Sequence, residues 1–289
     1  MKAVYVVDAV RTPIGKFGGA LSHWRPDDLL AYILRALLQR NESVDPARIE
    51  DVIAGAANQA GEDNRNVARM ASLLAGLPVT VPGNTVNRLC ASGLQAIMDG
   101  ARQIATGDAE LIIASGVESM TRAPFVMGKS NTAFDRQTSF FDTTLGWRFI
   151  NPRLAAQYPP FTMGETAENV ARQWKISRED QDAFAFSSQQ KYFAAKEADR
   201  WAEEIQPVEQ VEKGMITWFT HDEHPRNTTA EKLASLQPAF VKDGTVTAGN
   251  ASGINDGSAA MLLASEEALK EFNLQPLGRI VSMAVAGVD

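Results

Sequence analysis

Cys90 is the only cysteine among the 289 residues, and its position in the chain suits a nucleophile. The stretch 82–93, Pro-Gly-Asn-Thr-Val-Asn-Arg-Leu-Cys-Ala-Ser-Gly, predicts a short strand, a tight corner and then a helix. A thiol at the start of a helix meets unpaired N–H groups and the positive end of the helix dipole, and both favour the nucleophilic thiolate. A lone cysteine is more often a buried core residue, so the interpretation depends on its neighbours. The helix itself is indicated by apolar residues spaced three and four apart: Leu94, Ile97, Ala101 and Ile104.

Few other residues could bind a metal ion. The histidines are His23, His221 and His224, and the last two form a His-x-x-His pair among acidic residues and a proline. Such a polar stretch is more typical of a solvated loop than of a metal site, so no metal is expected.

The composition is that of a globular protein, with 45% hydrophobic and 22% charged residues. The net charge of −7 and the lack of a basic run argue against nucleic acid as a partner. A single cysteine cannot form an internal disulfide, which fits a reducing, cytoplasmic location. No apolar run has the length of a membrane span, and the N-terminal run is too short for a signal peptide, so no membrane partner is expected.

Residues 1–118 alternate apolar runs with helical patterns. Strands are predicted at residues 3–8, 52–57, 85–87 and 110–116. Helices are predicted through residues 29–37, with Asp27 or Asp28 as the cap, at 66–77, and directly after Cys90. This alternation predicts an α/β fold in which a mostly parallel sheet carries helices on its faces.

Residues 119–244 have a different character and are expected to form a separate loop or lid domain. Long irregular stretches surround two predicted helices, at 166–174 and at 177–200. An insertion of this kind is usually a lid or a binding element.

The first pattern resumes at residues 245–276, which are assigned to the same core as residues 1–118. A strand is predicted at 259–264 and a helix at 265–272. The run 279–288 is similar to the opening strand, so residues 277–289 are expected to begin a second, C-terminal copy of the unit.

Four segments, in this order, resemble motifs of the thiolase family and together run nearly end to end. They are Asn87–Gly93, Gly116–Pro124, Met163–Asn169 and Thr247–Gly257. The resemblance implies a layered thiolase-like α/β fold with an inserted loop domain, whose C-terminal repeat is essentially absent from this chain.

The resemblance also implies a reaction. In thiolases a cysteine thiolate, here Cys90, attacks the 3-carbonyl of a 3-oxoacyl-CoA. Acetyl-CoA leaves as an enolate, and a second CoA removes the acyl group from the cysteine. The backbone amide of Cys90 is expected to serve one of the oxyanions. The family thus implies acyl-CoA and CoA as partners, CoA as co-substrate without a covalently bound cofactor, and assembly as a homodimer or homotetramer.

Three further segments are similar to the 3-oxoadipyl-CoA (beta-ketoadipyl-CoA) thiolases of aromatic-compound degradation: residues 59–69, 141–152 and 221–226. Thr162 stands where acetoacetyl-CoA thiolases commonly carry a histidine, and Gly164 departs from the proline usual in the 3-oxoadipyl branch. The alternatives are an acetyl-CoA C-acetyltransferase, a fatty-acid 3-ketoacyl-CoA thiolase, a condensing synthase with one active cysteine, or a non-catalytic acyl-CoA-binding partner.

The resemblance assigns binding roles to several residues. Ser252 resembles the serine that bonds the pantetheine arm, although a turn-forming serine is the alternative. Arg226 resembles the arginine at the nucleotide end of CoA, with plain solvation as its alternative. Arg148 is the candidate partner of the distal carboxylate of an acidic substrate. Four residues are carried over as apolar walls of the CoA tunnel, with core packing equally open for each: Met163, Leu236, Phe240 and Ala248.

Three catalytic residues of the family have no counterpart here. They are a histidine that activates the nucleophile, a second cysteine that acts as acid and base, and an asparagine that positions a water. Because members of a catalytic set act as a unit, the chain is expected to be an N-terminal piece of a thiolase that is inactive alone.

Overall fold

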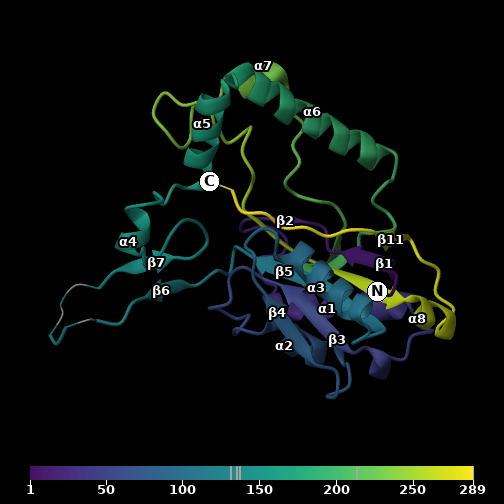
Figure 1. Ribbon diagram of the computed structural model, residues 1–289. Helices are drawn as coiled ribbons and strands as arrows, with labels where there is room; N and C mark the ends of the chain where they lie inside the picture. The colour runs from purple at the N-terminus through teal and green to yellow at the C-terminus, as the bar shows by residue number, and fades with distance from the viewer. Residues whose placement is uncertain (131, 135, 137, 213, 289) are drawn as a thin grey trace. The chain divides into compact units, whose positions relative to one another are not determined.

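The computed structural model describes residues 1–130, 132–134, 136, 138–212 and 214–288, and Figure 1 shows its ribbon. Asp289, the last residue of the expected range 277–289, lies outside the described residues. The chain forms two compact units, which are described separately. Unit 1 comprises Met1–Arg122, Glu203–Glu223 and Asn255–Asp289, and unit 2 comprises Ala123–Ala202 and His224–Ile254.

Unit 1 is built on a mixed sheet. Its strands lie in the order β11 (Gly278–Ile280), β1 (Val4–Arg11), β10 (Asn255–Ser265), β5 (Leu111–Ser119), β3 (Asp51–Gly55) and β4 (Gly83–Val86), and β2 (Gly15–Lys16) pairs with β10. Strand β3 runs parallel to β4 and β5, but β10 runs antiparallel to both β1 and β5.

The expectation of a mostly parallel sheet is therefore wrong: among the described residues, only the two pairings of β3 are parallel, and the other four pairings of this sheet are antiparallel. The physical reason lies in the connection between β5 and β10. The chain leaves unit 1 shortly after β5 and re-enters directly before β10, and Asp256 pairs with Ser119 at that same edge. A strand that starts where its neighbour ends must run in the opposite direction.

Hydrophobic cores lie on both faces of this sheet because successive strand residues point to opposite sides. Along β3, Val52 and Ala54 belong to one core and Ile53 to the other, and β5 alternates in the same way. The first core is covered by α1 (Pro26–Arg40), α2 (Val67–Ala75) and α8 (Glu266–Glu271), and the second by α3 (Ser92–Thr106). The α/β class predicted from the sequence is confirmed.

The start of α1 differs from the expectation. Neither Asp27 nor Asp28 is the cap; the cap residue is Arg25, which makes no side-chain cap bond, and Pro26 opens the helix. Proline suits this first position because its φ is already helical and its missing N–H would have no helical partner. By contrast, α2 has a side-chain cap, since Asn66 Oδ1 accepts from the N–H of Arg69.

Residues 203–223, expected in the loop domain, pack with unit 1 instead. They contain the hairpin of β8 (Val208–Glu212) and β9 (Met215–Phe219). Val208 and Phe219 are buried in the first core, and the backbone of Arg11 exchanges hydrogen bonds with Glu204 and Gln206. Burial of two apolar side chains explains the grouping.

The predicted strand at 279–288 is much shorter in the structure. Strand β11 ends at Ile280, which pairs with Val4, the first residue of β1. Residues that follow Ile280 would extend past the start of β1 and find no backbone partner there, and residues 281–288 take no regular structure. A short 3-10 turn, Pro46–Arg48, precedes β3.

Unit 2 is mainly helical. It contains the hairpin of β6 (Phe125–Met127) and β7 (Phe140–Asp142), and then the helices α4 (Pro152–Ala155), α5 (Met163–Trp174), α6 (Arg178–Glu197) and α7 (Ala230–Ala234). Helix α5 begins three residues earlier than the sequence pattern predicts because Thr162 and Glu165 form a capping box. Helix α6 is capped by Ser177, the first residue of the range 177–200 that the sequence predicts for this helix.

Candidate active site

Cys90 is exposed on the short connection between β4 and α3. The predicted order of strand, corner and helix is confirmed, with the helix starting two residues after the cysteine. Ala91, the cap residue of α3, makes no side-chain cap bond, so no side chain satisfies the helix N-terminus from that position. Of the predicted helix face, Ala101 and Ile104 are buried, whereas Leu94 is 59% exposed.

The corner that holds Cys90 is strained and tightly bonded. Leu89 has a φ of 49°, in the left-handed region that a branched side chain rarely adopts. The side chain of Asn87 accepts from the N–H of Leu89 at 2.8 Å. Ser92 Oγ accepts from the N–H of Arg88 at 2.9 Å and donates to the carbonyl of Leu89 at 2.6 Å. These bonds hold the residues on both sides of the cysteine.

The start of α3 lies directly on the backbone of the sheet. A Cβ atom on Gly55 of β3 would come within 2.3 Å of the carbonyl carbon of Ser92 and 2.4 Å of the nitrogen of Gly93. A Cβ on Gly116 of β5 would meet the carbonyl oxygen of Gly55 at 3.2 Å. Only glycine at position 55 permits this close approach, and it therefore sets the height of the cysteine above the sheet.

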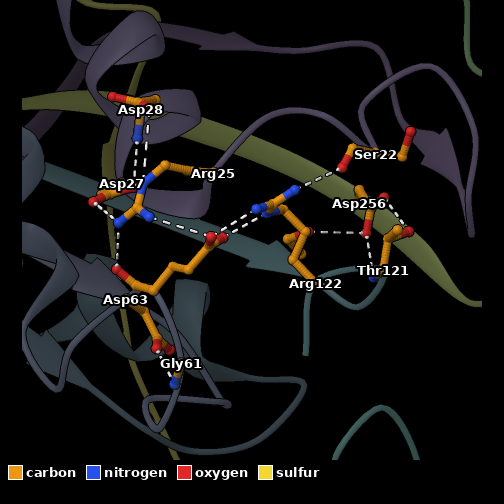
Figure 2. A network of polar contacts seen from close by, with 11 residues as sticks. Ser22, Arg25, Asp27, Asp28, Gly61, Asp63, Thr121, Arg122 and Asp256 are labelled. Carbon is orange, nitrogen blue, oxygen red and sulfur yellow. Dashed lines mark hydrogen bonds and ion pairs between the residues drawn. The ribbon is translucent and has the colours of Figure 1, made fainter. Parts of the chain in front are cut away.

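A polar network lies where the chain leaves and re-enters unit 1 (Figure 2). Its members Arg25, Thr121, Arg122 and Asp256 are labelled in Figure 2. Glu62 accepts two hydrogen bonds from Arg122, at 2.5 and 2.6 Å, and a third from Arg25. The Arg122 guanidinium holds the pKa of Glu62 below its usual value. Asp256 accepts from the N–H and the hydroxyl of Thr121, at 2.9 and 2.6 Å. The network thus fixes the parts of unit 1 at which the chain passes to unit 2 and returns from it.

At three glycines of unit 2, the lack of a side chain allows close packing at or beside a predicted binding residue. A Cβ on Gly164, beside Met163, would lie 2.1 Å from the ring of Phe240. A Cβ on Gly249, beside Ala248, would lie 2.5 Å from Leu236. The third glycine, Gly253, lies beside Ser252, and its missing Cβ would be 1.9 Å from the ring of His224. Each contact requires the absence of a side chain.

Buried carboxylates hold the segment that carries Ala248. Glu168 of α5 accepts from the N–H groups of Thr245 and Val246, both at 2.7 Å, and from the Thr245 hydroxyl. Burial pushes the pKa of Glu168 upward, but these hydrogen bonds outweigh it and keep the pKa below its usual value. Asp182 of α6 accepts from Asn250 at 2.9 Å. Sequence reasoning missed both carboxylates: Glu168 lies within the segment Met163–Asn169, but nothing in that segment indicates its partners near residue 245, and Asp182 lies outside all the motif segments.

The candidate CoA-binding residues are accessible rather than packed into a core. Met163 is 75% and Phe240 44% exposed, while Leu236 is partly buried. The remaining candidates, Ala248, Ser252 and Arg226, are also exposed.

Arg148 lies between two anchored aromatic residues. Trp147 Nε1 donates to the carbonyl of Phe161 at 3.0 Å, and the ring of Phe149 lies 4.9 Å from that of Phe141. The guanidinium of Arg148 forms no hydrogen bond or ion pair with a residue that the structure describes.

His224 contributes more than the solvated loop expected from the sequence. Its ring is partly buried against Gly253, and burial, followed by the nearby Arg226, lowers its pKa. His221 is exposed and belongs to unit 1. Among the described residues, no group of three or more His, Cys, Asp or Glu could hold a metal ion. Within the same residues, no helix is both long and apolar enough to cross a membrane.

Cys90 belongs to unit 1, and all seven candidate binding residues belong to unit 2: Arg148, Met163, Arg226, Leu236, Phe240, Ala248 and Ser252. The glycine contacts link Phe240 to the start of α5 and Leu236 to the 248–249 turn, and His224 to the 252–253 turn. The structure contains no hydrogen bond between Cys90 and a histidine among the described residues.

Comparison with solved structures defines the class of fold. The crystal structure of the Bacillus anthracis acetyl-CoA acetyltransferase matches with a TM-score of 0.90 and 44% identity, over 100% of this chain and 72% of that one. Human mitochondrial 3-ketoacyl-CoA thiolase in complex with CoA matches with a TM-score of 0.85 and 38% identity, over 96% of this chain and 68% of that one. The chain therefore has the thiolase fold.

The sequence comparisons show the family. Residues 4–267 match the family described as "Thiolase, N-terminal domain". The chain is 57% identical to the "3-oxoadipyl-CoA/3-oxo-5,6-dehydrosuberyl-CoA thiolase" of Escherichia coli (strain K12), over 100% of this chain and 73% of that protein. The chain belongs to the thiolase family of acyltransferases, which use CoA as a substrate, and the resemblance found in the sequence is confirmed.

Proposed function

We propose that Cys90 is the acyl-accepting nucleophile of a thiolase reaction on 3-oxoadipyl-CoA. The single observation that carries this proposal is the strained, bonded corner that presents an exposed thiol at the uncapped N-terminus of α3. The thiolate attacks the 3-carbonyl, and the bond between C2 and C3 breaks. Its electron pair leaves on acetyl-CoA as an enolate, which takes up a proton. The acyl group that remains on sulfur is transferred to a second CoA.

The residues of unit 2 would bind the CoA part of both substrates. Met163, Leu236, Phe240 and Ala248 would contact the pantetheine arm, and Ser252 would bond it. The guanidinium of Arg226 would meet the nucleotide end, where its charge suits a phosphate. Support comes from their exposure and from the glycine contacts that hold the aromatic and aliphatic walls in place.

The substrate proposal depends on Arg148. A 3-oxoadipyl group ends in a carboxylate, and an arginine can bind a carboxylate through two parallel hydrogen bonds. Arg148 is held between anchored aromatic residues and makes no ion pair with a described residue. The 57% identity to a 3-oxoadipyl-CoA thiolase supports the same substrate class.

A second candidate is an acetyl-CoA C-acetyltransferase, favoured by the structural match to the enzyme of Bacillus anthracis. A fatty-acid 3-ketoacyl-CoA thiolase is favoured in the same way by the human match. Both would act on substrates without a distal carboxylate, so neither needs Arg148. Assembly as a homodimer or homotetramer and a cytoplasmic location stay predictions, and light scattering tests the first.

We also propose that these 289 residues accept an acyl group without turning over. Release of the acyl group needs a base that takes the proton from the thiol of the second CoA, and Cys90, the only thiol in the sequence, is itself acylated at that stage. Without a second acid or base, the reaction would stop at the acyl-enzyme.

The experiment is intact mass spectrometry of the protein after incubation with acetyl-CoA, with Cys90→Ser as control. The proposal predicts one acetyl group per chain, absent from the variant, with no continuous release of product when CoA is added. Reversible binding of acetyl-CoA without acylation would favour a non-catalytic acyl-CoA-binding protein. Sustained turnover would refute the claim of inactivity while leaving Cys90 as nucleophile.

A further inference from the structure

A series of hydrogen bonds connects the corner at Cys90 to one carboxylate on the sheet, that of Glu118 in β5. We propose that Glu118 is a positioning residue, which orders the Cys90 corner through the backbone of residues 57–58 and the side chain of Asn87. Glu118 touches neither the thiol nor the substrate in this proposal. The inference deepens the proposed function, since it rests on Cys90 as the acyl acceptor.

Each link in this chain of contacts is a hydrogen bond of ordinary length. The N–H groups of Ala57 and Asn58 donate to the two carboxylate oxygens of Glu118, at 2.8 and 3.2 Å. The carbonyl of Ala57 accepts from Asn87 Nδ2 at 2.8 Å. The other end of the same amide, Asn87 Oδ1, accepts from the N–H of Leu89 at 2.8 Å. Glu118 is thus connected to the residue that directly precedes the cysteine.

The chemistry of Glu118 suits this role better than that of a surface carboxylate. No ion pair of the described residues involves it, and the charged group that acts on it is another carboxylate, Asp63. Burial raises its pKa above the usual value, and the two backbone N–H groups offset this only in part. An unpaired, partly buried carboxylate is costly, and its two oxygens are used to hold two successive amides at once.

The corner needs such external support because it is strained. Leu89 keeps a left-handed backbone that a leucine adopts only when its surroundings impose it. Asn87 uses both ends of its side-chain amide, one on the corner and one on residue 57. If residues 57–58 lose their anchor, Asn87 loses its fixed partner and Leu89 can relax. The thiol then spends less time in the geometry for attack, and the acylation rate falls.

The test compares Glu118→Gln with Glu110→Gln. Glu110 directly precedes the same strand, β5, and is bonded to Lys2. Glutamine has a similar shape to glutamate but has only one acceptor oxygen, so one of the two N–H groups faces a donor. We expect Glu118→Gln to slow acylation of Cys90 by acetyl-CoA at least about tenfold, as for the loss of a hydrogen bond to a charged group. Faster amide exchange is expected in a peptide spanning residues 86–92, and Glu110→Gln should change neither.

A second variant separates positioning from general loss of stability. Asn87→Ala removes the middle link and leaves Glu118 in place, and it should lower the acylation rate in the same direction. Because both residues act along one path, the double variant should be about as slow as the slower single variant. Protonation of the Cys90 thiolate at low pH slows acylation in both proteins, so the test compares their rates: the ratio of the rate of the unaltered protein to that of Glu118→Gln should fall towards one as the pH is lowered and Glu118 becomes protonated.

The outcomes for the two proposals are distinct. If the unaltered protein takes up no acyl group, the proposed function fails, and amide exchange at residues 86–92 still decides the role of Glu118. Unchanged exchange and unchanged acylation in Glu118→Gln, at an unchanged melting temperature, would overturn the inference. Fully multiplicative losses in the double variant would also overturn it.

Discussion

At the scale of single residues, the corner at Cys90 combines strain with dense bonding. Leu89 pays a conformational cost in the left-handed region, while Asn87 and Ser92 bond the backbone on either side of the cysteine. Strain of this kind persists only where neighbouring groups impose it, and it is concentrated at functional sites. The arrangement fixes the thiol without covering it, as an attacking group requires.

Arg148→Ala is expected to distinguish the substrate classes. Removing the guanidinium should slow acylation of Cys90 by 3-oxoadipyl-CoA about tenfold or more, since a hydrogen bond to a charged group is lost. Acylation by acetoacetyl-CoA, which has no distal carboxylate, should be nearly unchanged. The measurement is the single-turnover rate with each substrate below saturation. Equal losses for both substrates would exclude Arg148 as the carboxylate partner.

His224 is expected to make stability depend on pH. Because burial lowers its pKa in the folded state, the unfolded chain binds the proton first as the pH falls below the usual value of 6.5. The stabilisation is thus present above that pH and is lost on acidification towards the lower folded pKa. Melting temperatures at about pH 7.5 and about pH 5.5 should differ less in His224→Gln than in the unaltered protein. An identical pH dependence in both would contradict this.

At the scale of elements, the position of the nucleophile depends on how α3 lies on β3. The glycine at position 55 lets two backbones touch, so the N-terminus of the helix is fixed against the centre of the sheet. Unit 2 uses the same device at Gly164, Gly249 and Gly253, where side chains fill the space above a glycine. Gly164, which stands where the 3-oxoadipyl branch usually has proline, makes one of these contacts. Any Cβ at this position would displace the ring of Phe240.

Gly55→Ala should be destabilising and should also misplace the thiol. The new Cβ would meet backbone atoms of Ser92 and Gly93, which cannot rotate away, so α3 must shift. Overpacking of this kind costs about 1–3 kcal/mol, and the acylation rate should fall further than stability alone explains. Gly278→Ala, where a Cβ meets nothing within 4 Å, is the control. Equal melting curves and rates for the two variants would show that the close approach is unimportant.

At the scale of the whole molecule, the sequence predicts local elements better than their pairing. The long helices, the main strands of the large sheet and the strand–corner–helix at Cys90 follow from periodicity and end signals, whereas the two hairpins β6–β7 and β8–β9 and the short helices α4 and α7 were not predicted. The antiparallel direction of β10 does not, because it depends on where the chain returns after an insertion of more than a hundred residues. The packing of residues 203–223 with unit 1 depends on two buried side chains, Val208 and Phe219, within a largely polar segment.

The candidate site likewise contains residues that the sequence predicts and residues that only the structure reveals. Cys90, Ser252 and the apolar residues were found through motifs that resemble a known family. Glu118 and Glu168 accept from backbone N–H groups distant in sequence, Asp182 accepts from the side chain of Asn250, and no local pattern marks such contacts. Residues that hold a site in place therefore had to come from the structure.

The most direct measurement is peptide mapping of the protein after brief incubation with 3-oxoadipyl-CoA. Cleavage between C2 and C3 would release acetyl-CoA and leave a four-carbon acyl group with its carboxylate on the enzyme. We predict that this group is found on the peptide that contains Cys90, in step with the acetyl-CoA released, and that Cys90→Ser forms neither product. An unmodified Cys90 in the presence of released acetyl-CoA, or an acyl group on another residue, would contradict Cys90 as the nucleophile.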